Sequence, residues 1–177
     1  MLNLNFTPFP TLYTQRLVLR QLQFSDAPAL SALRSMPQVN QYIDRTPFLS
    51  IEEANKQIER LTNGVAAGTN GYWVISALGS NDLIGTCCLF NFSEPNLSAE
   101  LGYELHPAWQ GKGIAAEAVD AVIKFATQSA GFKTIEAVIQ PANLKSIALV
   151  KRFGFNRDEA TEARLALKGF EVFVLKE

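Results

Sequence analysis

The 177-residue sequence has little cysteine and little histidine: two cysteines and one histidine. Cys87 and Cys88 are adjacent within an apolar run, so they offer neither a spaced disulfide framework nor a metal-ligand pattern. Neighbouring side chains on a strand point to opposite faces, which disfavours a disulfide between them. A nucleophilic cysteine would need His106 as its base. We therefore expect two core thiols and no metal site.

The sequence also lacks a charge excess and a long apolar run. Its 16 Lys and Arg residues against 17 Asp and Glu give a formal net charge of -1, so no basic surface for nucleic acid is indicated. No stretch approaches the roughly 18 apolar residues of a membrane span, and the start, MLNLNFTPFP, lacks the basic region of a signal peptide. The expected protein is cytoplasmic, with neither nucleic acid nor membrane as partner.

What the sequence does contain is the composition of a globular domain. The apolar fraction is 47% and the charged fraction 19%. A chain of this length can bury a core of its own, and no linker, repeat or low-complexity tract divides it. We expect one domain over residues 1–177.

Hydrophobic periodicity predicts a mixed α/β fold. Strands are expected at 16–22, 72–78, 83–92, 99–105 and 134–140, with a final hairpin over 164–175 around Lys168 and Gly169. Helices are expected from about 26 to 36, from a cap at Ser50 to about 64, and over 114–128 and 144–153. This order predicts an α/β (α+β) domain with a single mixed, mostly antiparallel, twisted sheet of about six to seven strands and helices on both faces.

The richest local motif is the glycine segment from Gln110 to Ala115, between a strand and a long helix. Glycines allow close backbone approach, and a helix start supplies unpaired N–H groups and a partial positive charge, which together favour an anionic phosphate. A helix-entry loop that needs glycine only for its dihedral angles is the simpler alternative. Gly111, Gly113 and Ala116 also satisfy G-x-G-x-x-[GA], but the residues from His106 to Gln110 separate that match from the preceding strand, unlike a dinucleotide site.

The segment resembles the GNAT superfamily of N-acetyltransferases, whose motif [RQ]-x-x-G-x-[GA] is matched by Gln110, Gly113 and Ala115. The blocks RLVLRQLQFSDAPAL, AELGYELHPAWQGKGIAAEA and QPANLKSIALVKRFGF resemble, in order and spacing, the branch that includes the ribosomal-protein N-terminal acetyltransferases RimJ and RimL. The resemblance covers most of residues 10 to 175. It implies the GNAT fold and acetyl-CoA as cosubstrate.

The resemblance also implies the cofactor-binding residues. Backbone N–H groups of the glycine segment would bind the pyrophosphate, while the pantetheine arm would pair with the strand end like an added strand. Family members often have a β-bulge at that strand end, which points an N–H at the thioester oxygen. Lys112 would add charge at the pyrophosphate or simply solvate the loop. The implied set is Tyr103, Leu105, His106, Gln110, Gly111, Lys112, Gly113, Ile114, Ala115, Asn143 and Ser146.

Three residues are candidates for catalysis. Ser146, in the N-x-x-S that begins with Asn143, matches a residue near the thioester sulfur in the RimL-like branch and would donate a proton to the departing thiolate. Helix capping would also account for both residues. Glu100 and Glu104, which share one strand face, are candidate general bases, although solvated strand residues or attraction of a cationic substrate would explain them too.

The resemblance implies direct transfer of the acetyl group to a primary amine, on a protein N-terminus or a small molecule, through a ternary complex. A non-catalytic acyl-CoA sensor with the same fold is the alternative. The glutamate that RimL has after F-G-F is replaced by Leu165, with Glu162 nearby, and this counts against a ribosomal-protein acceptor. Relatives that form dimers make a homodimer an expectation by analogy.

Overall fold

The computed structural model describes residues 2–47, 50–166 and 169–177. Its centre is a mixed eight-stranded sheet in the order β1-β2-β3-β4-β5-β6-β8-β7, in which only β5 and β6 are parallel neighbours. The predicted fold class is confirmed, with one strand more than expected. The strands are β1 (Leu12–Tyr13), β2 (Leu17–Gln21), β3 (Gly71–Ala77), β4 (Gly85–Ser93), β5 (Ser98–Leu105), β6 (Thr134–Ile139), β7 (Asn156–Arg157) and β8 (Glu171–Lys176).

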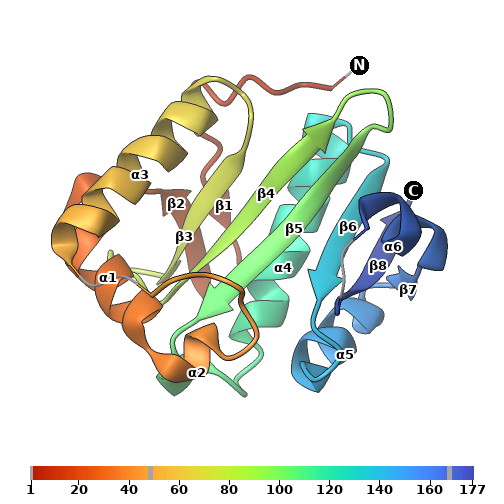
Figure 1. Ribbon diagram of the computed structural model, residues 1–177. Helices are drawn as coiled ribbons and strands as arrows, with labels where there is room; N and C mark the ends of the chain where they lie inside the picture. The colour runs from red at the N-terminus through yellow and green to blue at the C-terminus, as the bar shows by residue number, and fades with distance from the viewer. Residues whose placement is uncertain (1, 48–49, 167–168) are drawn as a thin grey trace.

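Helices cover both faces of this sheet (Figure 1). One face packs against α1 and α3 through a cluster that includes Leu30, Ile58 and Val74. The other packs against α4 and α5 through a larger cluster that includes Val122 and Val150. The helices are α1 (Ala27–Ser35), α2 (Pro37–Asn40), α3 (Ile51–Ala66), α4 (Ile114–Lys124), α5 (Leu144–Arg152) and α6 (Glu159–Leu165), with short η1 (Phe24–Asp26) and η2 (Pro107–Trp109) and a π-helical continuation of α4, η3 (Phe125–Ala130).

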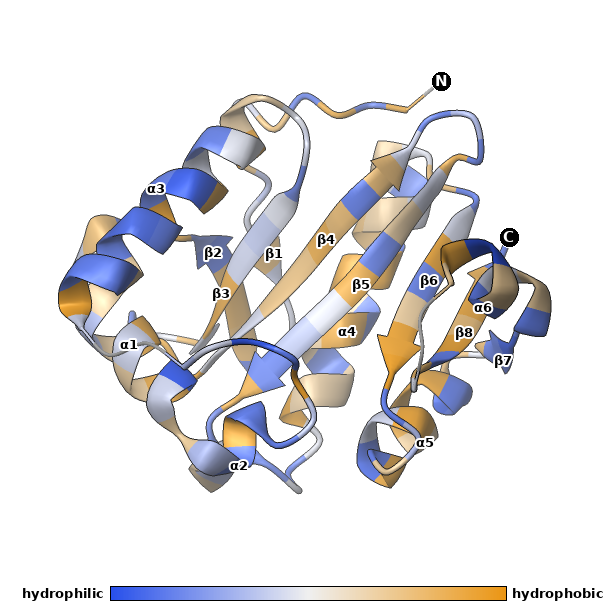
Figure 2. Cartoon of the chain, viewed as in Figure 1, coloured by the Kyte–Doolittle hydropathy of each residue, from blue (hydrophilic) through white to orange (hydrophobic). Residues whose placement is uncertain are grey.

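Helix starts follow the sequence signals. Ser50 accepts a hydrogen bond from the Glu53 N–H at 3.2 Å, which confirms the predicted cap of α3. Apolar side chains of α3 are buried in the cluster beneath it, whereas its charged residues are exposed. Figure 2 shows the resulting mixture of hydrophobic and hydrophilic residues along α3. Among the described residues, no helix has the length and apolar character needed to cross a membrane.

The predicted final hairpin over 164–175 is wrong. Residues 159–165 form α6, because Asp158 caps this segment by accepting a hydrogen bond from the Thr161 N–H at 2.8 Å. The strand that follows, β8, pairs with β6 and with the two-residue β7 instead of folding back on its own neighbour. Lys168, predicted at the hairpin turn, lies outside the described residues.

The feature that positions the candidate site is a fork between β5 and β6. The two strands pair in parallel only from Ser98–Thr134 to Glu100–Glu136, whereas each continues for several more residues. Figure 1 shows them diverging toward the end of the molecule where α5 lies. On this side β5 ends at Leu105 and is followed by η2 and the glycine segment, while β6 ends at Ile139, four residues before Asn143, so both sequence motifs follow the open end of the fork.

Candidate active site

The glycine segment presents a run of unpaired backbone donors. Gly111 and Gly113 have φ of 74° and 76°, a left-handed conformation that favours glycine, and Gly113 is the N-cap of α4. The first helical N–H with a backbone acceptor is that of Glu117, which donates to the Gly113 carbonyl at 3.1 Å. Within the described residues, no acceptor is recorded for the N–H groups from Gly111 through Ala116. Six consecutive donors at the positive end of a helix are an arrangement that favours an anion.

Side chains outside the glycine segment, together with that of its first residue, Gln110, fix the backbone of this loop. Arg16 donates from Nη1 to the Lys112 carbonyl at 3.0 Å and pairs through Nη2 with Glu117 Oε2 at 2.6 Å. Glu117 also accepts from Thr14 Oγ1 and from the Arg16 N–H. Gln110 donates from Nε2 to the Leu105 carbonyl at 3.0 Å. The loop backbone is thus fixed by contacts that leave its N–H groups free.

The side chains in the glycine segment differ in placement. Ile114 is buried in the core and anchors the start of α4, so only its backbone faces the loop. Lys112 is exposed, and its Nζ lies 5.7 Å from the centroid of the Trp109 ring, a cation–π contact. Its ammonium therefore remains at the surface beside the loop.

Backbone groups of β5 face the fork. In an antiparallel ladder, successive residues direct their N–H and C=O groups alternately toward and away from the partner strand. The His106 N–H donates to the Ile84 carbonyl of the β4 side at 2.9 Å, in continuation of the Gly85–Leu105 register. Tyr103 and Leu105 therefore direct their backbone groups toward the β6 side, as an added strand would require, although the Leu105 carbonyl already accepts from Gln110 Nε2.

Two expectations for this strand end need correction. His106 cannot offer its N–H to the fork, because that group is bonded to Ile84, and its Nδ1 accepts from the Ala108 N–H at 3.2 Å. The bulge expected near Tyr103 is absent from the described ladder, which is regular from Gly85–Leu105 to Phe90–Glu100. The register shift lies at the other end, between Phe90 and Ser93, where Asn91 has a φ of 50°.

Asn143 and Ser146 meet the open end of the fork from α5. Asn143 Oδ1 accepts from the Ser146 N–H at 3.2 Å, so the capping role foreseen for Asn143 is present. The Ser146 hydroxyl lies 2.7 Å from the hydroxyl of Tyr103. Burial raises the pKa of Tyr103 to about 12, and the Ser146 hydrogen bond opposes that rise. Sequence reasoning assigned Tyr103 only a backbone role and missed this side-chain contact.

Glu104 is the centre of a buried ionic network on the sheet face that α1 covers, opposite the face on which Tyr103 packs. Its Oε1 accepts from Arg34 Nε at 2.8 Å and from Thr86 Oγ1 at 3.0 Å, while Arg45 Nη1 lies 2.5 Å from Oε2. Arg34 also donates to the Tyr72 hydroxyl at 2.8 Å. Burial alone would raise the pKa of Glu104, but the two guanidinium groups outweigh it and hold that pKa below 4.5. Glu104 is therefore a fixed anion and a weak base.

Glu100 has a different environment at the vertex of the fork. Burial raises its pKa, a hydrogen bond from Asn91 Nδ2 at 2.9 Å lowers it, and the charge of Glu136 raises it again, with a net increase. Glu136 is the direct register partner of Glu100 on β6 and accepts a hydrogen bond from Arg164 at 2.8 Å. No arginine is recorded with Glu100 among the described residues. Of the two candidate bases, Glu100 has the more basic carboxylate.

Burial outweighs the only cation that acts on either cysteine in the described residues, Arg34 beside Cys88. Both are free; Cys87 is fully buried, and burial raises the pKa of Cys88 to about 12. Neither is a thiolate near neutral pH, which argues against a cysteine nucleophile. In the described part of the chain, no three His, Cys, Asp or Glu side chains gather as a metal site would require.

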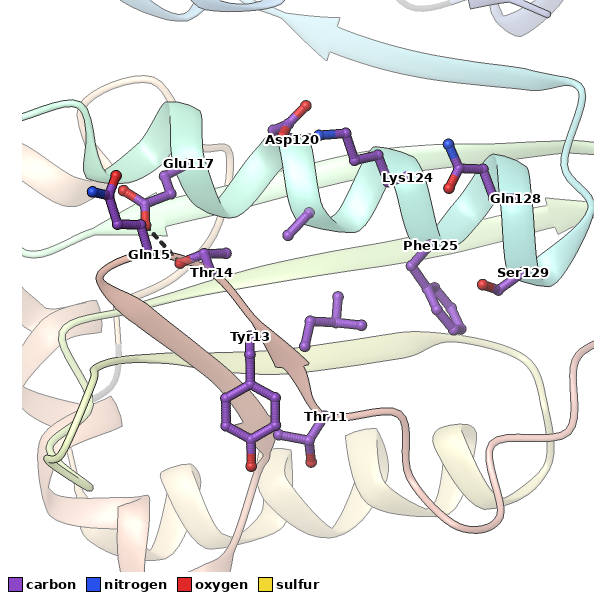
Figure 3. Close-up of a pocket in the computed structure, with 12 residues that line it drawn as sticks. Thr11, Tyr13, Thr14, Gln15, Glu117, Asp120, Lys124, Phe125, Gln128 and Ser129 are labelled. Atoms are coloured by element: carbon purple, nitrogen blue, oxygen red, sulfur yellow. Dashed lines mark hydrogen bonds and ion pairs between the residues drawn. The ribbon is translucent and has the colours of Figure 1, made fainter.

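A separate surface hollow lies between β1 and α4 (Figure 3). Tyr13 and Thr14 line it from one side, and Asp120, Lys124 and Gln128 from the other. None of the predicted site residues contributes to its lining. The candidate site is the fork with its flanking loops, not this hollow.

Comparison with known proteins agrees with this geometry. The family described as Acetyltransferase (GNAT) domain matches residues 16–156. The chain is 34% identical to the N-acetyltransferase p20 of Bacillus licheniformis over 84% of this chain and 83% of that protein. It is 28% identical to the [ribosomal protein uS5]-alanine N-acetyltransferase of Escherichia coli over 58% of this chain and 53% of that protein. The structure of RimL, a ribosomal-protein α-N-acetyltransferase, in complex with coenzyme A superposes with a TM-score of 0.81 at 21% identity, covering 94% and 98% of the two chains.

The fold and the family match define an acyltransferase class. The chain belongs to the GNAT acetyltransferase family and is an N-acetyltransferase by that membership. The comparisons give no support to the non-catalytic sensor that the sequence leaves open. They also remove the dinucleotide alternative, although β5, α4 and β6 do form a parallel strand–helix–strand unit.

Proposed function

We propose that the protein transfers the acetyl group of acetyl-CoA directly to a primary amine at the β5–β6 fork. The observation that carries the proposal is the run of unpaired N–H groups from Gly111 to Ala116, at the end of a strand whose own backbone groups face the fork. The pyrophosphate binds to that run, and the pantetheine arm pairs with Tyr103 and Leu105. Asn143 and Ser146 complete the cofactor side from α5.

The amine reaches the thioester from the α1 face, on which Glu100 lies. Glu100 accepts a proton from the amine, directly or through a water molecule, and its raised pKa suits that role. The amine nitrogen forms the new bond to the acetyl carbon, and the carbon–sulfur electron pair leaves with sulfur. Ser146 donates a proton to the departing thiolate and regains one from solvent, while Glu100 releases the amine proton to solvent, so the proton that the nitrogen loses balances the one that sulfur gains. Glu104, paired with Arg34 and Arg45, shapes this face and transfers no proton.

We propose a peptide or small-molecule α-amine as the acceptor. An α-amine has a reference pKa of about 7.7–8.0, so a useful fraction is neutral at pH 7, whereas a lysine at about 10.4 is almost wholly charged. Two similar proteins are named as ribosomal-protein N-acetyltransferases, which supports a protein N-terminus. Glu162 does not offer a free carboxylate in place of the one missing at Leu165, because it pairs with Arg157 at 2.8 Å and accepts from the Val172 N–H.

Three wider features belong to the proposal. We propose that residues 1–177 act as one catalytic domain, that the protein works in the cytoplasm, and that it forms a homodimer. Size-exclusion chromatography with light scattering measures the last of these.

Thiol release tests the proposed function. The purified protein is incubated with acetyl-CoA and, in turn, α-amino peptides, polyamines, amino sugars and aminoglycosides, and free coenzyme A is measured. Thermal shifts with acetyl-CoA and with NAD are recorded alongside. Amine-dependent release, with a shift for acetyl-CoA alone, is the expected result. A shift for NAD and none for acetyl-CoA would contradict the proposal.

A further inference from the structure

The Tyr103–Ser146 hydrogen bond is the polar side-chain contact that spans the fork. Tyr103 lies on β5 three residues beyond Glu100, the last residue of that strand paired with β6. Ser146 lies in the first turn of α5, after the end of β6, and the two oxygens are 2.7 Å apart. The bond therefore joins the two sides of the fork, β5 and the start of α5, beyond the point where β5 and β6 are joined by backbone hydrogen bonds.

Each hydroxyl group in this pair has one hydrogen to donate and lone pairs to accept. A phenol is a stronger acid than an alkyl alcohol, so the favoured arrangement has the Tyr103 O–H donating and the Ser146 oxygen accepting. The pKa of Tyr103, raised to about 12 by burial, keeps its hydrogen in place throughout the working pH range. The Ser146 hydrogen is then not used in the bond to Tyr103 and is free to donate elsewhere.

Further contacts hold both Tyr103 and Ser146 in place. The Tyr103 ring packs against the larger core cluster, and Ser146 is held through its own N–H by the Asn143 cap. Serine in the first turn of a helix can otherwise direct its hydroxyl to nearby backbone groups. A buried donor on its oxygen limits that freedom.

We propose that Tyr103 is a positioning residue for Ser146: its phenol donates to Ser146 Oγ and so turns the serine hydrogen toward the sulfur of the bound thioester. This inference rests on the proposed role of Ser146 as donor to the leaving thiolate. Tyr103 itself touches no reacting atom in this account. Its side chain complements its backbone, which pairs with the pantetheine arm.

Three variants test the inference: Tyr103→Phe, Ser146→Ala and the double variant. The control is Tyr13→Phe, which removes the same atom from an exposed tyrosine on β1. Steady-state kinetics use the best acceptor from the thiol-release panel, and melting temperature and acetyl-CoA affinity are measured for each variant. We expect Tyr103→Phe to lower kcat about tenfold, as the loss of one hydrogen bond would, with KM for acetyl-CoA within about twofold of wild type. Tyr13→Phe should match wild type.

The double variant separates positioning from a general structural effect. If Tyr103 acts through Ser146, its loss costs nothing once Ser146 is alanine, so the double variant should have the kcat of Ser146→Ala. A double variant whose loss is the product of the two single losses would overturn the inference, as would a Tyr103→Phe variant with wild-type kcat. Wild-type protein that releases no thiol with any amine would instead reject the proposed function, so the two failures are distinguishable.

Discussion

The carboxylate of Glu104 lies 2.8 Å from Nε of Arg34, which is 70 positions earlier in the chain, and both side chains are largely buried. A second arginine, Arg45, meets the other carboxylate oxygen. This network joins α1 and the segment after α2 to the C-terminal end of β5. On the sheet face from which we propose that the amine approaches, one anion is thus held by two cations.

Replacing Glu104 by Gln should therefore destabilise the protein strongly. The change leaves the buried Arg34 and the partly buried Arg45 without their anion, which costs about 3 kcal/mol in free energy of unfolding. Urea denaturation at pH 7 measures it. The matched control is Asp120→Asn, which breaks the exposed ion pair with Lys124 on α4 and should cost less than about 0.5 kcal/mol. Equal losses in the two variants would contradict the burial argument.

The pH dependence of that loss has a definite sign. Because the folded-state pKa of Glu104 lies below 4.5, the ionised carboxylate contributes stability above the unfolded-state pKa. That contribution disappears as the pH falls through the folded pKa, where the wild-type side chain becomes neutral like the amide. The gap in stability between wild type and Glu104→Gln should thus be full at pH 6–7 and narrow below about pH 4.5. A gap that stays constant to the acid limit would exclude ionic pairing as its cause.

Gly113→Ala should lower the affinity for acetyl-CoA in addition to the stability of the fold, whereas a control glycine variant should lower the stability alone. A Cβ at this position, with φ of 76°, would be strained and would stand on the loop whose N–H groups form the proposed anion site. Gly79 is the control, since it has φ of 82° with open space around it, in the turn between β3 and β4. Both variants should lose about 1 kcal/mol of stability from the backbone strain. Isothermal titration calorimetry should show a raised Kd for acetyl-CoA in Gly113→Ala alone; an unchanged Kd would refute the pyrophosphate site.

Glu100→Gln should lower turnover without lowering stability. The raised pKa means that the ionised Glu100 opposes folding at neutral pH, so the amide should leave the melting temperature unchanged or slightly higher. Loss of a general base costs about 10²-fold or more in kcat at pH 7. The deficit should shrink above pH 8, where the α-amine is neutral without help. A pH-independent deficit would assign Glu100 to acceptor binding instead of proton transfer.

Much of the sheet and part of the site follow from local sequence. The central antiparallel strands were predictable, because β3 and β4 are long apolar runs joined by turn residues and β5 alternates apolar and polar residues. The glycine segment and the cap at Asn143 were predictable because their chemistry is encoded within a few neighbouring residues. Each of these signals lies within a short stretch of sequence, and the corresponding strand, loop or cap is present in the structure.

What the sequence could not reveal depends on tertiary packing. β1 and β7 have two residues each, too few for a periodic pattern, and exist only because a neighbouring strand pairs with them. The partners of Glu104 and of Tyr103 are 70 and 43 positions away, respectively, and no local signal links them. The alternation in β5 did show that Glu100 and Glu104 share a face. It could not show that the arginines neutralise only one of them.

The most direct test of the central claim is a crystal structure of the protein with bound coenzyme A. Our account predicts the pyrophosphate within hydrogen-bond distance of the N–H groups from Gly111 to Ala116, the pantetheine arm along Tyr103 and Leu105 between β5 and β6, and the sulfur beside Ser146. Coenzyme A bound elsewhere, for example in the hollow between β1 and α4, with the fork closed, would contradict it.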